Sequence, residues 1–223
     1  MTYHHHFEEI IEDISQMNWG RLSQEELMAV AWAYYFFSIQ FRENLGIACT
    51  LHPGDGKLQE LTDGECQTDN LSPWPGVAAP GERMNHDEFM RRSLRLVSLP
   101  VEKRVVLAML GQRYLDTVRA MDPVVRAMSI GSYEAGGLET VFRAFLTAPE
   151  WDNPLLEAFR HFLIQHIRFD SDPDHGHGAL SRHLAADDRI LPLWREFHTL
   201  LAESVPSLAN RQDAPSNRVF ETA

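Results

Sequence analysis

The sequence predicts an all-α fold, a single helical bundle of about seven to eight helices. Apolar side chains recur at three- and four-residue spacing along most of the chain, the pattern of helices with one buried face. Proline and capping residues stand where several of these periodic segments begin. No segment alternates β-branched and polar residues as a half-buried strand would, and no internal repeat is evident. These observations together favour helices packed on helices.

The first part of the chain predicts a helix over residues 7–17 and then a longer, central one. The Ser23-Gln-Glu-Glu26 sequence matches a capping box and opens a helix over residues 25–49. This second helix is apolar on nearly all sides, which is typical of a helix surrounded by others. We therefore assign its aromatic residues to the core, with the wall of a substrate pocket as the alternative.

Residues 52–81 are rich in proline and glycine, which excludes a long element there and leaves a short helical turn at residues 58–65. Trp74 and Val77 in this irregular segment are expected to pack against the bundle. A helix is predicted over residues 82–97, and Pro100 separates it from the next one at residues 101–121.

Pro123 starts a further helix, which the glycine-rich stretch Gly131 to Gly137 either interrupts or bends before helical spacing resumes at residues 138–146. Helices are also predicted over residues 154–169 and 190–205, and Pro206 ends the last one. We expect one domain over residues 1–206 and a polar C-terminal tail over residues 207–223.

Composition limits the possible functions. The net charge of −12 argues against a nucleic-acid partner, which would require clustered lysine and arginine. No apolar run is long enough for a transmembrane helix, and the N-terminus lacks the features of a signal peptide, so we expect a cytoplasmic protein with no membrane partner. The two cysteines form neither a disulfide framework nor a zinc motif. The run His4 to His6 is either the remnant of a purification tag or native, and these histidines are left out of the site.

Histidine and aspartate are concentrated between His166 and His183, a stretch with four of the eleven histidines and three aspartates. His166 and Asp170 lie one helical turn apart and would share a face. His177 is about two turns beyond Asp170, and His175 competes with it as a ligand from a loop. Imidazole and carboxylate side chains on one face are ligands for iron, manganese or zinc. The alternative is a helix end whose polar side chains face water.

Two other segments could supply the remaining ligands. His86 opens the helix after the irregular segment, and either Glu65 upstream or Glu82, one turn before it, could accompany it. Glu134 lies among small and apolar residues, where a buried carboxylate must be paired or bind a cation. A surface position for His86 or Glu134 is the competing interpretation. We expect the neighbouring Tyr133 to form a pocket wall.

The order of these motifs resembles that of the heme-oxygenase-like diiron oxidases and oxygenases, a superfamily that includes the thiaminase-II-like (TenA-like) and pyrroloquinoline-quinone-synthase-like proteins. Leu61-Thr-Asp-Gly-Glu65 and His86-Asp-Glu-Phe89 are similar to its first ligand motifs, and His177-Gly-Ala-Leu180 to its last. Glu134 and His166 are 32 positions apart, like the third and fourth ligands of the family. Two gaps, between Glu65 and His86 and between Asp170 and His177, are longer than in the family. The resemblance implies six metal ligands: Glu65, His86, Glu134, His166, Asp170 and His177.

The resemblance further implies a non-heme diiron enzyme that uses O2 to oxidise a small organic acid, amino acid or amine. One alternative is a metal-free TenA-like protein that binds or hydrolyses a small heteroaromatic ligand, for which Cys49 or Cys66 would have to be nucleophilic. Another is a non-catalytic helical interaction protein, in which the ligand side chains would be scattered by more than about 10 Å. An exposed apolar face that pairs two copies in a homodimer is also plausible.

Overall fold

The computed structural model describes residues 5–170, 177–181 and 183–209, with the side chain of Asp170 excepted. The prediction of an all-α fold is confirmed, because the described residues form helices and contain no strand beyond two isolated bridges. The α-helices are α1 (His6–Ser15), α2 (Gln24–Leu51), α3 (Gly56–Glu65), α4 (His86–Ser93), α5 (Val101–Arg119), α6 (Pro123–Ser132), α7 (Leu138–Phe145), α8 (Pro154–Asp170), α9 (His177–Ser181) and α10 (Leu191–Ser204). A π-helical segment (Tyr133–Gly137) joins α6 to α7, and short 3-10 turns occur at Trp19–Arg21, Asp188–Ile190 and Pro206–Leu208.

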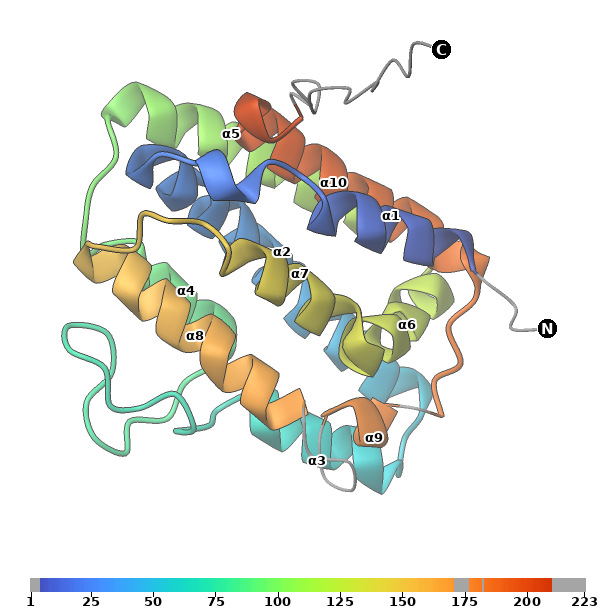
Figure 1. Ribbon diagram of the computed structural model, residues 1–223. Coiled ribbons are helices and arrows are strands. Elements are labelled where there is room, and N and C mark those ends of the chain that lie inside the picture. The colour runs from blue at the N-terminus through green and yellow to red at the C-terminus, as the bar shows by residue number, and fades with distance from the viewer. Residues whose placement is uncertain (1–4, 171–176, 182, 210–223) are drawn as a thin grey trace, which may run out of the picture.

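Helix α2 is the central element, as its apolar sequence predicts. It contacts α3, α4, α5, α6, α8 and α10. Its first turn carries the predicted capping box, in which Ser23 and Glu26 bind each other's backbone N–H groups. Figure 1 shows α2 and α7 between a group formed by α1, α5 and α10 and a group formed by α3, α4 and α8. Helices α3, α4 and α8 therefore lie on one side of α2.

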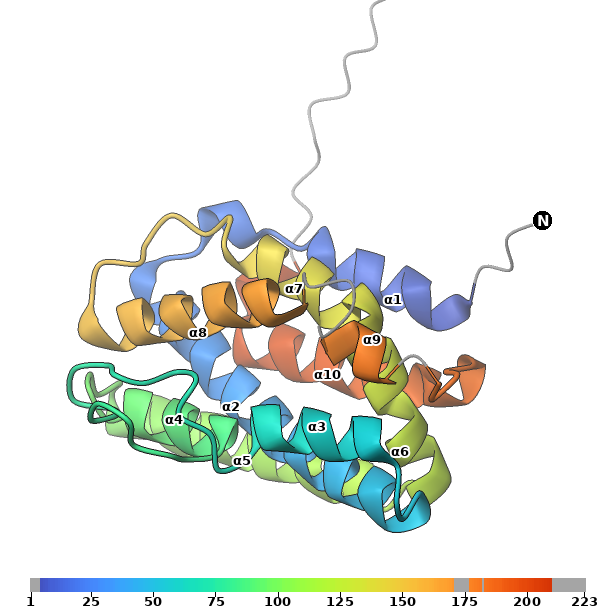
Figure 2. The same ribbon diagram turned by 90° about the horizontal axis from the view of Figure 1, so that it is seen from below.

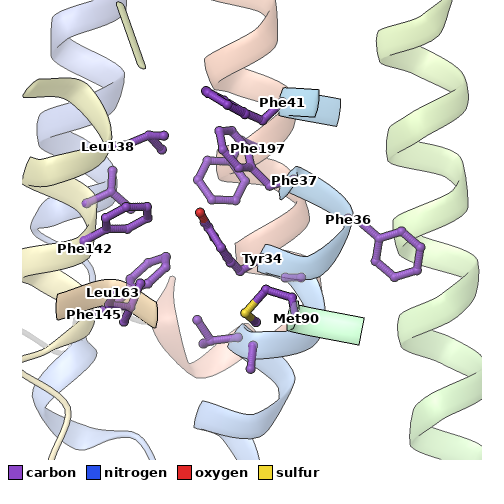
Figure 3. Close-up of a cluster of buried hydrophobic side chains, with 14 of the residues drawn as sticks. Tyr34, Phe36, Phe37, Phe41, Met90, Leu138, Phe142, Phe145, Leu163 and Phe197 are labelled. Carbon is purple, nitrogen blue, oxygen red and sulfur yellow. The ribbon is translucent and has the colours of Figure 1, made fainter. Parts of the chain in front are cut away.

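Aromatic side chains from several helices fill the core around α2. Tyr34 and Phe37 of α2 face Phe142 of α7 and Phe197 of α10, whereas Phe36 points the other way, toward α5 (Figure 3). A Cβ atom at Gly111 of α5 would lie 2.0 Å from the Phe36 ring, so only glycine lets α5 pack this closely. The aromatic residues of α2 are thus core residues, as the sequence predicts, and Tyr34 and Phe41 also line a cavity described below.

The structure corrects two predicted boundaries. Helix α4 begins at His86 instead of residue 82, because Met84 forms an isolated bridge with Thr68 and keeps the chain extended up to Asn85. The packed domain also extends beyond residue 206. Leu208 is buried in the core, and the Ser207 hydroxyl donates a hydrogen bond of 2.6 Å to Glu26, so the polar tail cannot begin at residue 207.

The glycine-rich stretch interrupts the regular helix between α6 and α7, and helical structure resumes after it. Gly136 has a φ of +100°, a conformation that side chains with a Cβ rarely adopt, and it breaks the regular helix between α6 and α7. Gly131 allows the backbone oxygen of Leu184 to come within 2.0 Å of where its Cβ would lie. The close backbone approach expected for these glycines is therefore present. Among the described residues, no helix has both the length and the apolar character needed to cross a membrane.

Candidate metal centre

Three of the predicted ligands come from three different helices and meet in the interior. Glu65 is the last residue of α3, His86 is the first residue of α4, and His166 lies near the end of α8. All three side chains are buried, with relative exposures of 5%, 5% and 6%. One ligand atom from each lies within 4.8 Å of the others, so this group could hold a metal ion. Figure 2 shows α3, α4 and α8 next to one another, as this convergence requires.

The nitrogen atoms of the two imidazoles and the oxygen atoms of the carboxylate lie close to one another. His86 Nδ1 is 2.7 Å from Glu65 Oε2 and 2.9 Å from His166 Nε2. His166 Nε2 is 3.8 Å from Glu65 Oε1. All of these atoms are possible metal ligands, because imidazole nitrogen and carboxylate oxygen both bind divalent cations.

Hydrogen bonds outside the cluster determine which nitrogen of each imidazole carries a proton. His166 Nδ1 lies 2.9 Å from the backbone oxygen of Phe162, an acceptor, so Nδ1 must be the donor. Asn70 donates through its Nδ2 to the backbone oxygen of Gly64 at 2.8 Å, which turns its Oδ1 toward His86 Nε2 at 3.0 Å. His86 Nε2 is therefore also a donor. In the neutral imidazoles, the two inner nitrogens are then left with lone pairs that point at each other and at Glu65.

Such an arrangement is unfavourable unless a cation is shared. Three electron-pair donors within hydrogen-bonding distance repel one another in a medium of low dielectric constant. Either a proton or a metal ion must lie between them. Metal-binding histidines usually donate their outer N–H to a carbonyl or carboxylate group, which is the arrangement of both His86 and His166. The donor set and its outer hydrogen bonds therefore fit a divalent metal ion.

The pKa shifts of two groups agree with a neutral His86 imidazole beside an ionised carboxylate. Burial lowers the pKa of His86 more than the nearby Glu65 raises it, so this imidazole is neutral at physiological pH. Burial raises the pKa of Glu65, whereas the neighbouring His86 and His166 lower it. Their effect is the larger one, so the pKa of Glu65 is well below the usual value for glutamate. Glu65 thus remains an anion that a cation would stabilise.

Glu65 also faces a second pair of predicted ligands through its other oxygen. Its Oε1 atom is 3.3 Å from His177 Nδ1, and this nitrogen is 3.3 Å from Glu134 Oε2. His177 opens α9, and Glu134 lies in the π-helical segment, with both side chains buried. Glu65 therefore contacts His86 through Oε2, and its Oε1 lies between His166 and His177. Single π-helical turns are frequent at functional sites.

Two glycines allow α9 to approach this closely. A Cβ atom at Gly64 of α3 would lie 3.2 Å from His177 Nε2, which is tighter than most such contacts. A Cβ atom at Gly178 would lie 2.7 Å from the backbone oxygen of Glu134. Because α9 packs against both α3 and the π-helical segment, these glycines help to place His177 between Glu65 and Glu134.

The remaining predicted residues have different outcomes. Glu82, the alternative to Glu65, pairs instead with Arg92 and with the backbone N–H of Ala79. The side chain of Asp170 and all of His175 lie outside the described residues. His177 is not on a continuation of α8, as the two-turn spacing assumed, because α8 ends at Asp170 and His177 begins the separate helix α9.

Tyr133 is a core residue and does not line the cavity at the site, contrary to the prediction. Its ring contacts Phe37 and Trp194, and its hydroxyl accepts a hydrogen bond of 3.1 Å from Gln40. The reason is helical geometry, since adjacent residues point in directions about 100° apart. Glu134 faces the ligands, and Tyr133 consequently faces the interior of the bundle.

A small cavity adjoins the candidate ligands. Its volume of about 20 Å³ is enough for roughly one water molecule. Its wall contains aromatic or aliphatic side chains together with charged ones: Tyr34, Ser38, Phe41, Arg42, Glu65, His86, Asp87, Glu134, Leu138, Phe162 and His166. Arg42 is the most exposed of the ionised residues, at 40%, and donates a hydrogen bond of 3.0 Å to Asp87. Arg42 and Asp87 therefore mark the side of the cavity nearest to solvent.

Sequence reasoning missed several residues that determine this geometry. Asn70 is one of them, because a lone asparagine in an irregular segment carries no signal, although its amide oxygen can accept the outer N–H group of a ligand histidine. Arg42 and Asp87 carried no local signal, because an arginine in an apolar helix and an aspartate in a first turn are both common. Searches of protein-family models, curated proteins and solved structures found no match to this chain.

Proposed function

We propose that the protein is a non-heme iron enzyme with a two-iron centre that uses O2 to oxidise a small organic acid, amino acid or amine. The observation that carries the proposal is the convergence of His86, His166 and Glu65, with both imidazoles held by outer hydrogen bonds in the tautomer that directs a lone pair inward. A purely structural cluster of this kind would need donors among its members, and these residues supply acceptors.

The chain offers ligands for two ions on either side of one carboxylate. Glu65, His86 and His166, whose ligand atoms lie within 4.8 Å of one another, would hold the first. Glu65 and Glu134, each 3.3 Å from His177 Nδ1, would hold the second together with His177. Buried bundle sites that combine glutamate and histidine from several helices are a known way to bind two such metals. When bound, iron supplies the redox equivalents and the open coordination positions that O2 chemistry requires.

The protein's own residues position the ligands and exclude water. Asn70 and the backbone oxygen of Phe162 keep the outer imidazole protons in place, which fixes ring orientation. The Phe162 ring stacks on His166 at a centroid distance of 4.0 Å, and Phe142 meets it edge-on at 5.9 Å. These rings keep the site dry, which strengthens its electrostatic interactions and protects reactive species from solvent.

The choice of iron among possible metals rests on the sequence resemblance. Two imidazoles and a carboxylate also suit zinc and manganese, so the donor set alone does not distinguish them. The order of the motifs along the chain is similar to that of diiron oxidases and oxygenases. In support, four of the other five corresponding residues, His86, His166, His177 and Glu134, lie next to Glu65 or next to a residue that contacts it.

The lining of the cavity supports a small polar substrate. Arg42 could bind a carboxylate, and Asp87 could bind an ammonium group, so both charges of a small amino acid have a partner on the solvent side of the cavity. Because the cavity has room for only about one water molecule, an organic substrate requires movement of the lining side chains. Arg42, which is 40% exposed, is the side chain best placed to move.

Two other functions have less support from the described residues. A thiaminase-like reaction needs a nucleophilic thiolate, but burial and the adjacent Glu65 raise the pKa of Cys66 to about 12, and Cys49 lies 3.2 Å from the hydroxyl of Thr62. An interaction protein with incidental histidines would have scattered ligand atoms, whereas those of Glu65, His86 and His166 lie within 4.8 Å of one another.

The test is to load the full chain with Fe(II) without oxygen, then measure O2 consumption with a panel of small acids, amino acids and amines. We expect O2 uptake that depends on iron and rises with at least one substrate class. The His161→Ala variant is a matched control, because His161 lies on α8 but faces Trp74 and Leu71 instead of the site. Uptake that is equal in wild type, His161→Ala and His166→Ala would contradict the proposal.

A further inference from the structure

Helix α5 exposes a group of apolar side chains that no other described element covers. Among the described residues, the large apolar side chains with exposures above half are Val101 at 58%, Val105 at 54%, Val106 at 53% and Met109 at 67%. All four lie within the first half of α5. Single exposed apolar residues are ordinary, but a contiguous group of this size on one helix marks an interaction surface.

A charged residue stands at each end of this group in a regular order. Glu102, Val106, Met109 and Arg113 follow one another at spacings of four, three and four residues, so they form one line along the exposed face of α5. Glu102 has no ion pair among the described residues, and Arg113 is 59% exposed and pairs with Glu203 of α10. The line reads acidic, apolar, apolar, basic. When two copies of this line run in opposite directions, the acidic residue of each therefore faces the basic residue of the other, and the apolar residues face one another.

We propose that the exposed face of α5 is the interface of a homodimer, in which the α5 helices of two copies pack antiparallel about a two-fold axis. The axis would lie midway between Val106 and Met109. Val106 of each copy then packs on Met109 of the other, and Glu102 of each copy pairs with Arg113 of the other. A two-fold axis brings the same surface of both copies together, so the surface must be self-complementary, as this line is.

The spacing of the line is also that of a helix-pairing seam. Alternating steps of four and three residues keep side chains on one side of a helix and allow them to fit between those of a facing helix. Val105 and Val101 lie beside the line and would widen the apolar part of the contact. Packing of one helix on its copy buries less than the roughly 800 Å² per partner of a standard interface, so a dimer in the micromolar range is expected.

The charges make this surface specific for a second copy. An apolar patch alone would accept many partners, whereas an acidic and a basic residue at equal distances from one midpoint match the same pair in reverse order. The guanidinium group of Arg113 has enough donors to keep Glu203 and accept Glu102 of a partner. Dimerisation is independent of metal binding, because none of these residues lies in the candidate metal centre.

Sedimentation velocity of the full chain, from about 1 to about 100 µM, tests the proposal. We expect a monomer–dimer equilibrium that the Met109→Glu variant weakens by at least about 100-fold, since it places two carboxylates in an apolar seam. The Val124→Glu variant is the matched control, because Val124 is 48% exposed on α6 and outside this face. Melting curves would verify that both variants fold. A monomer at every concentration, or a dimer that Met109→Glu leaves unchanged, would overturn the proposal.

Mixing two charge variants tests the antiparallel pairing itself. Glu102→Arg and Arg113→Glu should each weaken the homodimer by about tenfold, because like charges then face each other twice. In an equimolar mixture of the two variants, every pair is again of opposite sign, so a heterodimer should form with about the affinity of the wild type. A mixture that associates no better than its components would overturn the antiparallel geometry.

Discussion

Two clusters of buried polar side chains lie on different sides of α2, and they differ in how their hydrogen-bond donors and acceptors are paired. One consists of polar side chains of α2, α5, α6 and the π-helical segment, namely Gln40, Asn44, Tyr114, Arg126, Ser129 and Tyr133. The other is the candidate metal centre formed by Glu65, His86, His166, His177 and Glu134. Both are largely shielded from water and both combine groups from several helices.

In the first cluster, donors and acceptors alternate. The hydroxyl of Tyr114 donates to Gln40, and the amide of Gln40 donates to the hydroxyl of Tyr133 at 3.1 Å. The amide of Asn44 donates to Ser129 at 3.0 Å and accepts from Arg126 at 2.8 Å. Each of these groups has a complementary partner, so this network stabilises the fold without a ligand.

In the second cluster, acceptors face acceptors. The inner nitrogens of His86 and His166 and the carboxylate of Glu65 all present lone pairs, because Asn70 and Phe162 hold the outer protons. The comparison teaches that burial and hydrogen bonding alone do not identify a functional site. What distinguishes the candidate metal centre is that ligand atoms of Glu65, His86 and His166 lie within 4.8 Å of one another, so that this group could hold a metal ion.

The largest expected effect comes from removing a ligand. His166→Ala should lower the affinity for Fe(II) or Zn(II) by more than about 100-fold, because loss of an outer partner alone typically costs 10- to 100-fold. Equilibrium titration against a competing chelator measures this change. His161→Ala on the same helix should bind metal as the wild type does. Equal loss in both variants would mean that the effect is structural.

The next effect tests the satisfied network. Asn44→Ala should lower the free energy of unfolding by about 2 kcal/mol, because the buried Nε–H group of Arg126 loses its acceptor and Ser129 loses one of its hydrogen bonds. Urea denaturation measures this change in the presence of a chelator. Metal affinity should stay the same, since none of these groups contacts the candidate metal centre. A weaker metal affinity would show that the two clusters are coupled.

A smaller effect is expected from the outer hydrogen bond of His86. Asn70→Ala should weaken metal binding by about tenfold, because His86 would lose the acceptor that fixes its ring and its tautomer. Asn70→Asp keeps an acceptor at this position and should retain most of the affinity. If the two variants bind metal equally well, the hydrogen bond to Asn70 does not orient the ligand.

The smallest effect is a dependence of stability on pH. Burial lowers the pKa of His86 below its ordinary value of 6.5, so between these two pKa values the unfolded chain binds a proton that the folded chain does not. The free energy of unfolding of the metal-free protein should therefore fall as the pH falls below 6.5, by up to about 1.4 kcal/mol per pH unit for this group. Denaturation at several pH values in chelator measures it. Stability that rises on acidification would contradict the assignment of a neutral buried imidazole.

Much of the fold could be predicted from the sequence. The helical periodicity of α2, α5, α6, α8 and α10 predicts these helices within a few residues, helped by Ser23, Pro100 and Pro123 at the starts of α2, α5 and α6. The structure of the irregular segment is harder to predict from the sequence. The bridge between Thr68 and Met84 joins two residues that are separated along the chain and meet only when it folds. That bridge is what delays the start of α4 to His86.

The candidate site was predicted in its residue types and only partly in its geometry. Glu134 stood out because a carboxylate among small and apolar residues needs a partner, and its burial agrees with that reasoning. The choice of Glu65 over Glu82 could not be made from spacing, since it depends on how α3 packs against α4 and α8. The role of Asn70 is likewise visible only in three dimensions, where its amide bridges Gly64 and His86.

The most direct test of the central claim is an anaerobic equilibrium titration of the full-length protein with Fe(II). The claim is that Glu65 lies between two groups of donors that require cations. It predicts saturable uptake of about two equivalents per chain, reduced to weak binding in the Glu65→Gln variant, which keeps the size of the side chain but removes its charge. An absence of saturable binding of Fe(II), Mn(II) and Zn(II), or equal binding by wild type and Glu65→Gln, would contradict the account.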